Sequence, residues 1–364
     1  MLLSSIASRF IKANLVVLGV VWATLIPDFS NAAPHASCTN PIIRKEWRNM
    51  DHATQKSYLD AVNCLLKRPT LYSKTVAPGA VNRYDDYVAI HIQSVYTAHG
   101  VGHFLAWHRY YIHHYENALR TECGYTGAQP YWDWTLDAPL GKYGQSPIWD
   151  ATYGFGGNGP YVEVPRGTFG MVVSPTDRSG GGCVPDGPLK DMIVNLGPGN
   201  NLNANPRCLA RDWSPNFAAQ NSNWNVTKQV LEQNDFGRFT SILESGTGAF
   251  MSGGNIHAGG HYSVGGYLGQ MGDFWVSPGD PVFFLHHTNL DRVWRSWQAK
   301  DLANRLNDIS GPLNYMDWQN VRGGNTTLDY EFNLGPLSGD VAVRDLMDIK
   351  GGFLCYDYDE LYPV

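Results

Sequence analysis

The histidines of this chain are its main candidates for metal-binding side chains. Twelve occur in 364 residues, and five of them fall in one stretch, HGVGHFLAWHRYYIHHYENAL, which runs from His99 to Leu119. A neutral imidazole can give one ring nitrogen to a transition metal while an acceptor holds the other nitrogen. A cluster of histidines is therefore informative when its spacing places several rings on one side of one element.

Helical spacing separates the histidines of this stretch. If a helix begins at His108, this residue heads an apolar face that also holds Tyr111, Ile112, Tyr115 and Leu119. The opposite face is polar and holds Arg109, His113, Glu116, Asn117 and Arg120. A histidine at the head of an apolar face is buried and needs a partner, either a hydrogen-bond acceptor, which is the commoner case, or a metal. We expect His113 to be solvated, whereas spacing leaves His103 and His114 undecided.

Two further histidine pairs are metal-ligand candidates. His257 and His261 in NIHAGGHYSVGG are four residues apart, so on a helix they would face the same way. The two glycines between them argue against a strong helix, and such pairs also occur on solvated faces. In GDPVFFLHHTNLDRVWRSWQ, both His286 and His287 begin helical faces that can be buried. Periodicity therefore does not choose between these two histidines.

Helices must position most of these residues. Helical spacing of apolar residues predicts helical stretches over roughly residues 40–68, 84–95 and 108–120, and from about Asp280 past Trp297. Between Gly141 and Asn223 glycine and proline are frequent and no helical period survives, which predicts a long loop-rich insertion. No repeat or linker divides the chain. A single, mostly helical domain with long irregular loops is the simplest interpretation.

The N-terminal 33 residues have the pattern of a signal peptide. Arg9 and Lys12 precede an apolar run over residues 13–26, and small residues follow at 30–33. The run is short for a membrane span, so we expect cleavage and secretion rather than an uncleaved anchor, and no membrane association of the mature chain. The predicted mature domain covers residues 34–364.

Six cysteines without a CxxC pair are typical of disulfides in an exported protein. Six cysteines allow fifteen pairings. We favour Cys38 with Cys355, which ties the termini together, and Cys64 with Cys123 and Cys183 with Cys208. Two sequons, at Asn225 and Asn325, are compatible with N-glycosylation.

Composition excludes some classes of partner. The formal net charge is -6, which gives no electrostatic basis for binding nucleic acid or anionic membranes. Aromatic residues make up 13% of the chain, which suits a pocket for a flat aromatic ligand. The sequence leaves the oligomeric state open.

Two motifs together resemble the type-3 copper family of tyrosinases, catechol oxidases and haemocyanin domains. The first is a histidine followed nine positions later by the histidine of an aromatic-His-Arg triplet and then by a glutamate. It is matched here by His99, Trp107, His108, Arg109 and Glu116. The second is Asp-Pro-x-Phe followed by a histidine four residues before an aspartate. It is matched here by Asp280, Pro281, Phe283, His287 and Asp291.

This resemblance implies a four-helix-bundle core that holds a binuclear copper site. It assigns six metal ligands, which are His91, His99, His108, His257, His261 and His287, and so selects His287 over His286. Six imidazoles, three per metal, form a neutral nitrogen cage that suits two copper ions. The core of the family ends near a Tyr-x-Tyr motif, which Tyr356 and Tyr358 match, and only six residues follow it. We therefore expect no C-terminal domain that shields the site.

The implied activity is oxidation of o-diphenols or o-aminophenols to quinones with O2. Glu244 lies where relatives carry an acid that orients a water or takes the phenol proton, and Asp291 is our candidate acceptor for a histidine ring. Many relatives have a cysteine where this chain has Thr97, which changes only how rigidly a ligand is held. Strong monophenol hydroxylases carry asparagine where this chain has Ala258, which argues against hydroxylation of monophenols.

Two other functions fit the same residues. The imidazoles would also hold zinc, which could serve a non-redox lyase or hydrolase step on an aromatic small molecule in secondary-metabolite biosynthesis. Carriage of O2 without catalysis is the third interpretation, and the expected absence of a shielding domain argues against it. Metal content and O2 consumption separate these alternatives.

Overall fold

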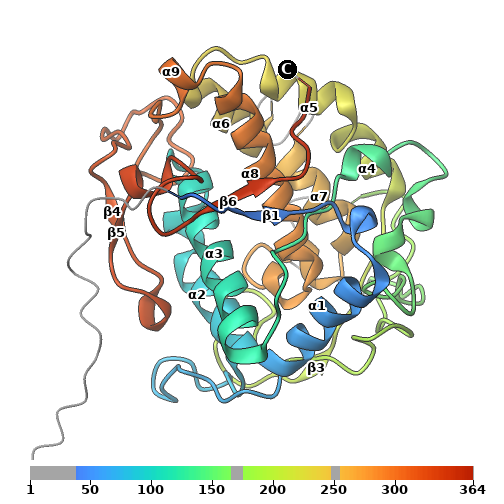
Figure 1. Ribbon diagram of the computed structural model, residues 1–364. Helices are drawn as coiled ribbons and strands as arrows, with labels where there is room; N and C mark the ends of the chain where they lie inside the picture. The colour runs from blue at the N-terminus through green and yellow to red at the C-terminus, as the bar shows by residue number, and fades with distance from the viewer. Residues whose placement is uncertain (1–37, 165–174, 247–254, 364) are drawn as a thin grey trace, which may run out of the picture. The chain divides into compact units, whose positions relative to one another are not determined.

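Helices supply most of the regular structure of the chain (Figure 1). The structure is a computed structural model that describes residues 38–164, 175–246 and 255–363. The predicted signal peptide, residues 1–33, lies outside the described residues. None of the described helices combines the length and the apolar character needed to cross a bilayer.

The first helix begins later than its apolar spacing predicts. A strand, β1 (Ile42–Arg44), precedes helix α1 (His52–Leu65). Asp51 sets the start of α1, because its side chain accepts a hydrogen bond from the backbone N–H of Thr54 at 2.8 Å. Strand β1 pairs in parallel with β6 (Tyr356–Tyr358), so segments from opposite ends of the sequence lie side by side (Figure 1).

Helices α2 (Arg83–Ala98) and α3 (Phe104–Cys123) cover two of the predicted helical stretches. Asn82 and Asp85 exchange hydrogen bonds at the start of α2, which satisfies backbone N–H groups that a helix start leaves free. Helix α3 begins one turn earlier than predicted. It ends at Gly124, whose φ of 70° closes the last turn in the left-handed region.

Six further helices follow among the described residues. They are α4 (Pro215–Asn221), α5 (Trp224–Leu231), α6 (Phe236–Ser245), α7 (Ile256–Gly265), α8 (Val282–Ala299) and α9 (Leu302–Arg305). Helix α8 confirms the helical stretch predicted after Asp280. The loop-rich insertion predicted between residues 141 and 223 ends in α4, so a helix lies where no helical period was found. A proline at the first position of α4 pre-sets the backbone angle that a helix needs.

The described strands are short and pair two by two. Besides β1 and β6, β2 (Ile193–Val194) pairs antiparallel with β3 (Arg207–Cys208), and β4 (Glu331–Phe332) pairs antiparallel with β5 (Val341–Ala342). Neither pair extends into a larger sheet. The loops that carry them therefore depend on packing against helices and on disulfides.

Four helices, α2, α3, α7 and α8, form the centre of the fold. Helix α3 packs against α1, α2 and α8, and α7 packs against α4, α6 and α8. Tyr115 of α3 stacks flat on Phe284 of α8 with ring centroids 3.5 Å apart, and Tyr84 of α2 meets the same phenylalanine edge-on. Burial of such large aromatic surfaces stabilises the packed helices. The predicted mainly α fold, with a four-helix core and long irregular loops, is confirmed.

Three disulfides join the six cysteines and leave none free. The pairs are Cys38–Cys355, Cys64–Cys123 and Cys183–Cys208. The first pair links the segments that lead into β1 and β6, and the second links the ends of α1 and α3. The three favoured pairings are confirmed.

Candidate metal centre

Two helices and the turn between them bring three histidines together, which we name the first histidine group: His91, His99 and His108. His91 lies in the middle of α2, His99 directly follows α2, and His108 lies one turn into α3. Gly100 makes the turn possible, because its φ is 61° and a Cβ there would lie 2.7 Å from the backbone nitrogen of Met316. The three imidazoles are buried and offer ring nitrogens within 4.8 Å of one another.

A second cluster of histidines lies on α7 and α8. It contains His257, His261, His286 and His287, all buried, with one nitrogen of each within 4.8 Å of the others. The first two lie four residues apart on α7, so they share one side of that helix.

Helix α7 runs through Gly259 and Gly260, although these glycines argue against a strong helix at this point. A Cβ on Gly260 would lie 2.2 Å from ring atoms of His286, and a Cβ on Gly259 would lie 2.4 Å from the hydroxyl of Ser222. Helices α8 and α4 therefore approach α7 more closely than any larger residue allows. This packing outweighs the low helix propensity of glycine.

The adjacent histidines of α8 point in different directions. Nε2 of His287 lies 3.1 Å from Nε2 of His261, which in turn lies 3.1 Å from Nε2 of His257. Nε2 of His286 instead donates to the backbone oxygen of His257 at 3.1 Å. We name His257, His261 and His287 the second histidine group, because only these three direct Nε2 atoms at one another.

Backbone carbonyls orient the rings of the first histidine group. Each Nδ1 lies 2.8 or 2.9 Å from a carbonyl oxygen, and the acceptors belong, in chain order, to Trp275, Val95 and Phe104. A carbonyl can only accept, so Nδ1 carries the proton and Nε2 keeps its lone pair. The Nε2 atoms of His91 and His108 are buried and have no hydrogen-bond partner among the described residues. Such unpaired buried acceptors fit a metal ion.

Burial keeps these imidazoles uncharged. It lowers the pKa of His91 to about 4, and burial together with the nearby His91 lowers the pKa of His261 to about 3. The pKa values of the other four histidines of the two groups lie well below the usual value, again first because of burial. A neutral imidazole is the form that binds a metal, and three nitrogens per group suit copper.

The two histidine groups face each other. The rings of His108 and His287 are stacked with centroids 4.3 Å apart, and those of His99 and His257 are nearly parallel at 5.8 Å. Each pair joins one ring from the first group to one from the second. The arrangement therefore fits two metal ions held side by side.

Asp291, predicted to accept a hydrogen bond from a histidine ring, accepts none from a histidine among the described residues. Its carboxylate accepts from Nε of Arg109 at 2.6 Å, from the hydroxyl of Tyr356 at 2.5 Å and from the hydroxyl of Tyr358. Burial alone would raise the pKa of Asp291, but Arg109 and Arg44 outweigh it and hold the pKa below its usual value. Because its partners lie on α3, β1 and β6, Asp291 ties α8 to the elements around it.

Most of the polar face of α3 is buried, so the expectation that His113 is solvated is wrong. His113 is 8% exposed, and its Nε2 lies 2.8 Å from the side-chain nitrogen of Asn117. Glu116, on the same face, pairs with Arg44 of β1 at 2.5 Å. The spacing within α3 does not reveal that other parts of the chain cover this side of the helix.

His103 and His114 belong to neither histidine group. Nε2 of His103 donates to the backbone oxygen of Thr97 at 2.8 Å, so the ring braces the turn between α2 and α3. His114 is half-buried and meets the ring of Tyr110 edge-on, with centroids 4.5 Å apart.

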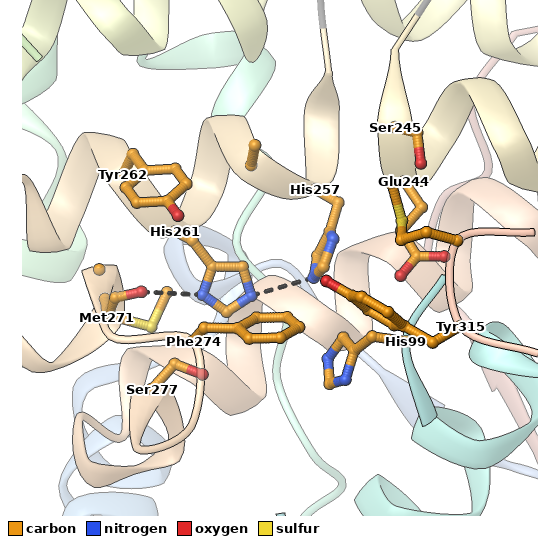
Figure 2. Close-up of a pocket in the computed structure, with 13 residues that line it drawn as sticks. His99, Glu244, Ser245, His257, His261, Tyr262, Met271, Phe274, Ser277 and Tyr315 are labelled. Atoms are coloured by element: carbon orange, nitrogen blue, oxygen red, sulfur yellow. Dashed lines mark hydrogen bonds between the residues drawn. The ribbon is translucent and has the colours of Figure 1, made fainter. Parts of the chain in front are cut away.

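A pocket opens beside the two histidine groups (Figure 2). It contains about 640 Å³ of space, part of which is open solvent. Its lining consists of His99, Glu244, Ser245, His257, Ala258, His261, Tyr262, Met271, Gly272, Phe274, Ser277, Tyr315 and Met316. Figure 2 shows the hydroxyl of Tyr315 directed toward the histidines. An apolar hollow with a few converging polar groups is the usual form of a small-molecule site.

Glu244 reaches the pocket from the end of α6. Its Oε1 accepts a hydrogen bond from the backbone N–H of Gly100 at 2.5 Å, whereas its Oε2 is buried without a partner among the described residues. Burial raises the pKa of Glu244 to about 8, against the opposing effect of the Gly100 hydrogen bond. One oxygen of this carboxyl group is therefore available to a molecule in the pocket.

The outer wall of the pocket was not predicted from the sequence. Phe274, Tyr315 and Met316 come from loops that precede α8 and follow α9. Loop residues of this kind carry no periodic signal, and the high aromatic content of the chain was the only indication of an aromatic pocket.

Comparison with known proteins finds a match to one family. The model of the common central domain of tyrosinase matches residues 81–300, which include both histidine groups.

Individual relatives agree with this match. A tyrosinase-like protein of Diaporthe leptostromiformis is 33% identical, over 93% of this chain and 82% of its own length. The N-acetyl-6-hydroxytryptophan oxidase of Emericella nidulans is 34% identical, over 88% of this chain and 93% of its own length. Among solved structures, a mutant polyphenol oxidase from Thermothelomyces thermophila has a TM-score of 0.76 and 36% identity, and the match covers 88% of this chain and 89% of that protein.

Proposed function

This chain belongs to the tyrosinase family, and we propose that it oxidises o-diphenols or o-aminophenols to quinones with O2. Membership makes it a tyrosinase-like oxidoreductase with a binuclear type-3 copper site. The proposed oxidation of o-diphenols or o-aminophenols rests on one observation. Two facing groups of buried imidazoles lie at the wall of an aromatic pocket.

We assign one copper ion to each histidine group. His91, His99 and His108 would hold the first ion, and His257, His261 and His287 would hold the second. Support comes from the unpaired Nε2 atoms of the first group and from the converging Nε2 atoms of the second. His286 is left out because its Nε2 already donates to a carbonyl.

When bound, the two copper ions supply the redox chemistry by accepting electrons from the diphenol and passing them to O2. Two diphenols lose four electrons and four protons, and one O2 takes these up and gives two waters. The chain must therefore bind the phenol, orient it and receive its protons.

The pocket orients the phenol by aromatic contact. Phe274 lies edge-on to His99 with ring centroids 5.1 Å apart, and Met271 and Ala258 add apolar surface. A flat ring that enters this space packs between apolar walls beside the histidines.

Glu244 is our candidate for the acceptor of the phenolic proton. Its Oε1 is held by Gly100, the residue after His99, so the free Oε2 is positioned beside the first histidine group. A carboxylate within reach of a phenol hydroxyl can act as a general base, and because burial raises the pKa of Glu244 to about 8, the form that accepts the proton becomes the major one only above about pH 8.

We expect little or no hydroxylation of monophenols. Ala258 lines the pocket with a methyl group and offers no polar contact. The amide of the nearby Asn255 is already engaged, because its oxygen accepts from Ala258 N–H at 2.9 Å and its nitrogen donates to the backbone oxygen of Glu244 at 2.5 Å. Neither group is available to help Glu244 with a second proton transfer.

The test is O2 uptake by copper-loaded protein with 4-methylcatechol, 2-aminophenol and 4-methylphenol. We expect two substrate molecules oxidised per O2 with the first two compounds and slow uptake with the third. The control is the same protein loaded with zinc, which has no redox chemistry. Copper-loaded protein that consumes no O2, together with stoichiometric zinc in the isolated protein, would contradict the proposal and support the non-redox alternative.

We further propose that the chain is exported, with residues 1–33 as a signal peptide and 34–364 as one mature domain. Three disulfides support an oxidising compartment. The two sequon asparagines, Asn225 and Asn325, are exposed. N-terminal sequencing of secreted protein tests the cleavage site.

A further inference from the structure

Aromatic rings continue outward from the first histidine group. Phe274 contacts His99 and lies 5.5 Å from Trp275, 6.3 Å from Tyr315 and 6.3 Å from Tyr96, measured between ring centroids. We name Tyr96, Phe274, Trp275 and Tyr315 the aromatic rim.

Three separate segments build the aromatic rim. Tyr96 lies in the last turn of α2, Phe274 and Trp275 in the loop before α8, and Tyr315 in the loop after α9. Tyr96 meets Tyr315 at 5.1 Å and Trp275 at 6.1 Å, both nearly perpendicular. Edge-to-face contacts of this kind fix the rings relative to one another.

The rim presents aromatic surface to solvent. Tyr96 is 55% exposed, and the other three rings are half-buried. A hydrophobic core does not require a large exposed ring at the end of α2. Tyr96 does not itself line the pocket, but it contacts Tyr315, which does, and an exposed ring joined to a pocket wall in this way is typical of a binding surface.

Charge does not dominate recognition in this region. Glu244 is the one acidic residue among the described pocket-lining residues, and that set contains no lysine or arginine. The guanidinium of Arg322 donates to the backbone oxygen of Tyr315 and faces the carboxylate of Asp317 at 3.8 Å. A substituent that extends toward the rim would therefore bind by aromatic contact.

We propose that the aromatic rim is a second subsite that selects o-diphenols carrying a second flat ring. The reactive ring would lie beside the histidine groups, and the second ring would pack against Tyr96 and Tyr315. This inference rests on the proposed diphenol oxidation and narrows its substrate class.

The test compares 4-phenylcatechol with 4-methylcatechol by O2 uptake of the copper-loaded protein. We expect kcat/KM to be roughly tenfold higher for the phenyl compound, as burial of a second ring implies. Tyr96→Leu and Tyr315→Leu should each lower this ratio severalfold. Tyr161→Leu, at a 56% exposed tyrosine outside the pocket lining, should leave the ratio unchanged.

A binding measurement without turnover completes the test. Under nitrogen, calorimetric titration with 4-phenylresorcinol and 4-methylresorcinol should show the same preference and the same loss in Tyr96→Leu. No O2 uptake with either catechol would overturn the proposed function itself. Uptake with both catechols but a ratio near one, or a ratio that neither rim variant changes, would overturn the subsite alone.

Discussion

The two histidine groups reach similar arrangements by different means. In the first group, a backbone carbonyl accepts from every Nδ1. In the second group, His261 has such an acceptor, the oxygen of Met271 at 3.0 Å, whereas Nδ1 of His287 is buried without a partner among the described residues. Packing orients His287 instead, since Phe283 stacks on its ring at 4.1 Å, while Gly260 of α7 lies against the ring of the neighbouring His286 and sets how closely α7 and α8 approach.

This difference separates two ways of positioning a ligand. A carbonyl fixes both the ring direction and the proton position before a metal binds. Close packing fixes the ring direction only, and it depends on helices α4, α7 and α8 keeping their spacing.

Removing one ligand from either group should abolish activity. We expect His108→Ala and His261→Ala each to bind one copper fewer and to lose O2 uptake by more than about 100-fold, since even partners of ligands contribute about 10- to 100-fold. His114→Ala, a histidine outside both groups, is the matched control. If either ligand variant kept a substantial part of the activity, the two groups would not form one site.

Removing the proposed proton acceptor should lower turnover without removing metal. Glutamine can keep the hydrogen bond to Gly100 but cannot accept a proton, so Glu244→Gln should lower kcat by at least about 100-fold with copper content unchanged. Glu232→Gln, at an exposed residue of α5's end, serves as the control. An unchanged kcat would assign Glu244 a structural role only.

Asp291→Asn should destabilise both groups together. The variant leaves the buried guanidinium of Arg109 without its carboxylate and Arg44 with Glu116 alone, which should lower the free energy of unfolding by about 3 kcal/mol. Urea unfolding measures this loss. Asp60→Asn, which breaks an exposed pair with Lys56, should change it by less than about 1 kcal/mol.

The same carboxylate should make stability depend on pH. Because the folded state lowers the pKa of Asp291, its contribution is complete above the unfolded value of about 3.9 and is lost as the pH falls through the lower folded value. The free energy of unfolding of the wild type, measured with urea, should therefore decrease below about pH 4. In Asp291→Asn this free energy should depend less on pH. If the free energy of unfolding depended on pH identically in both proteins, Asp291 would not be the source of the dependence.

Gly260→Ala should disturb the second group alone. Its new Cβ would meet the His286 ring at 2.2 Å, so α7 and α8 must separate at a cost of about 1–3 kcal/mol. Copper should leave the second group at a lower chelator concentration, while the first group keeps its ion. Gly339→Ala, where a Cβ meets nothing within 4 Å, is the control. Equal loss of copper from both histidine groups would contradict the inference that close packing positions only the second group.

The spacing of residues along the sequence predicted the features that depend on the periodicity of a single helix. It found the core of α8, the buried position of His108 and the shared side of His257 and His261. It could not exclude His286, because both faces of α8 are buried. The family motif supplied His99 and His287, and the structure brings both beside the other four histidines.

The errors share one physical cause, which is contact with distant segments. Gly260 lies in a helix because α8 packs against it, His113 is buried because other segments cover α3, and Asp291 meets two tyrosines far along the chain. The pocket walls come from loops without periodicity. In each case the residues that make the contact lie far along the sequence from the position whose structure they determine.

Copper content separates the two adjacent histidines of α8 as ligands. We expect two copper ions per chain in the wild type and in His286→Gln, and one in His287→Gln. Metal analysis after identical copper loading and desalting gives the answer. Loss of one copper from His286→Gln with two retained by His287→Gln would contradict the assignment of the second histidine group.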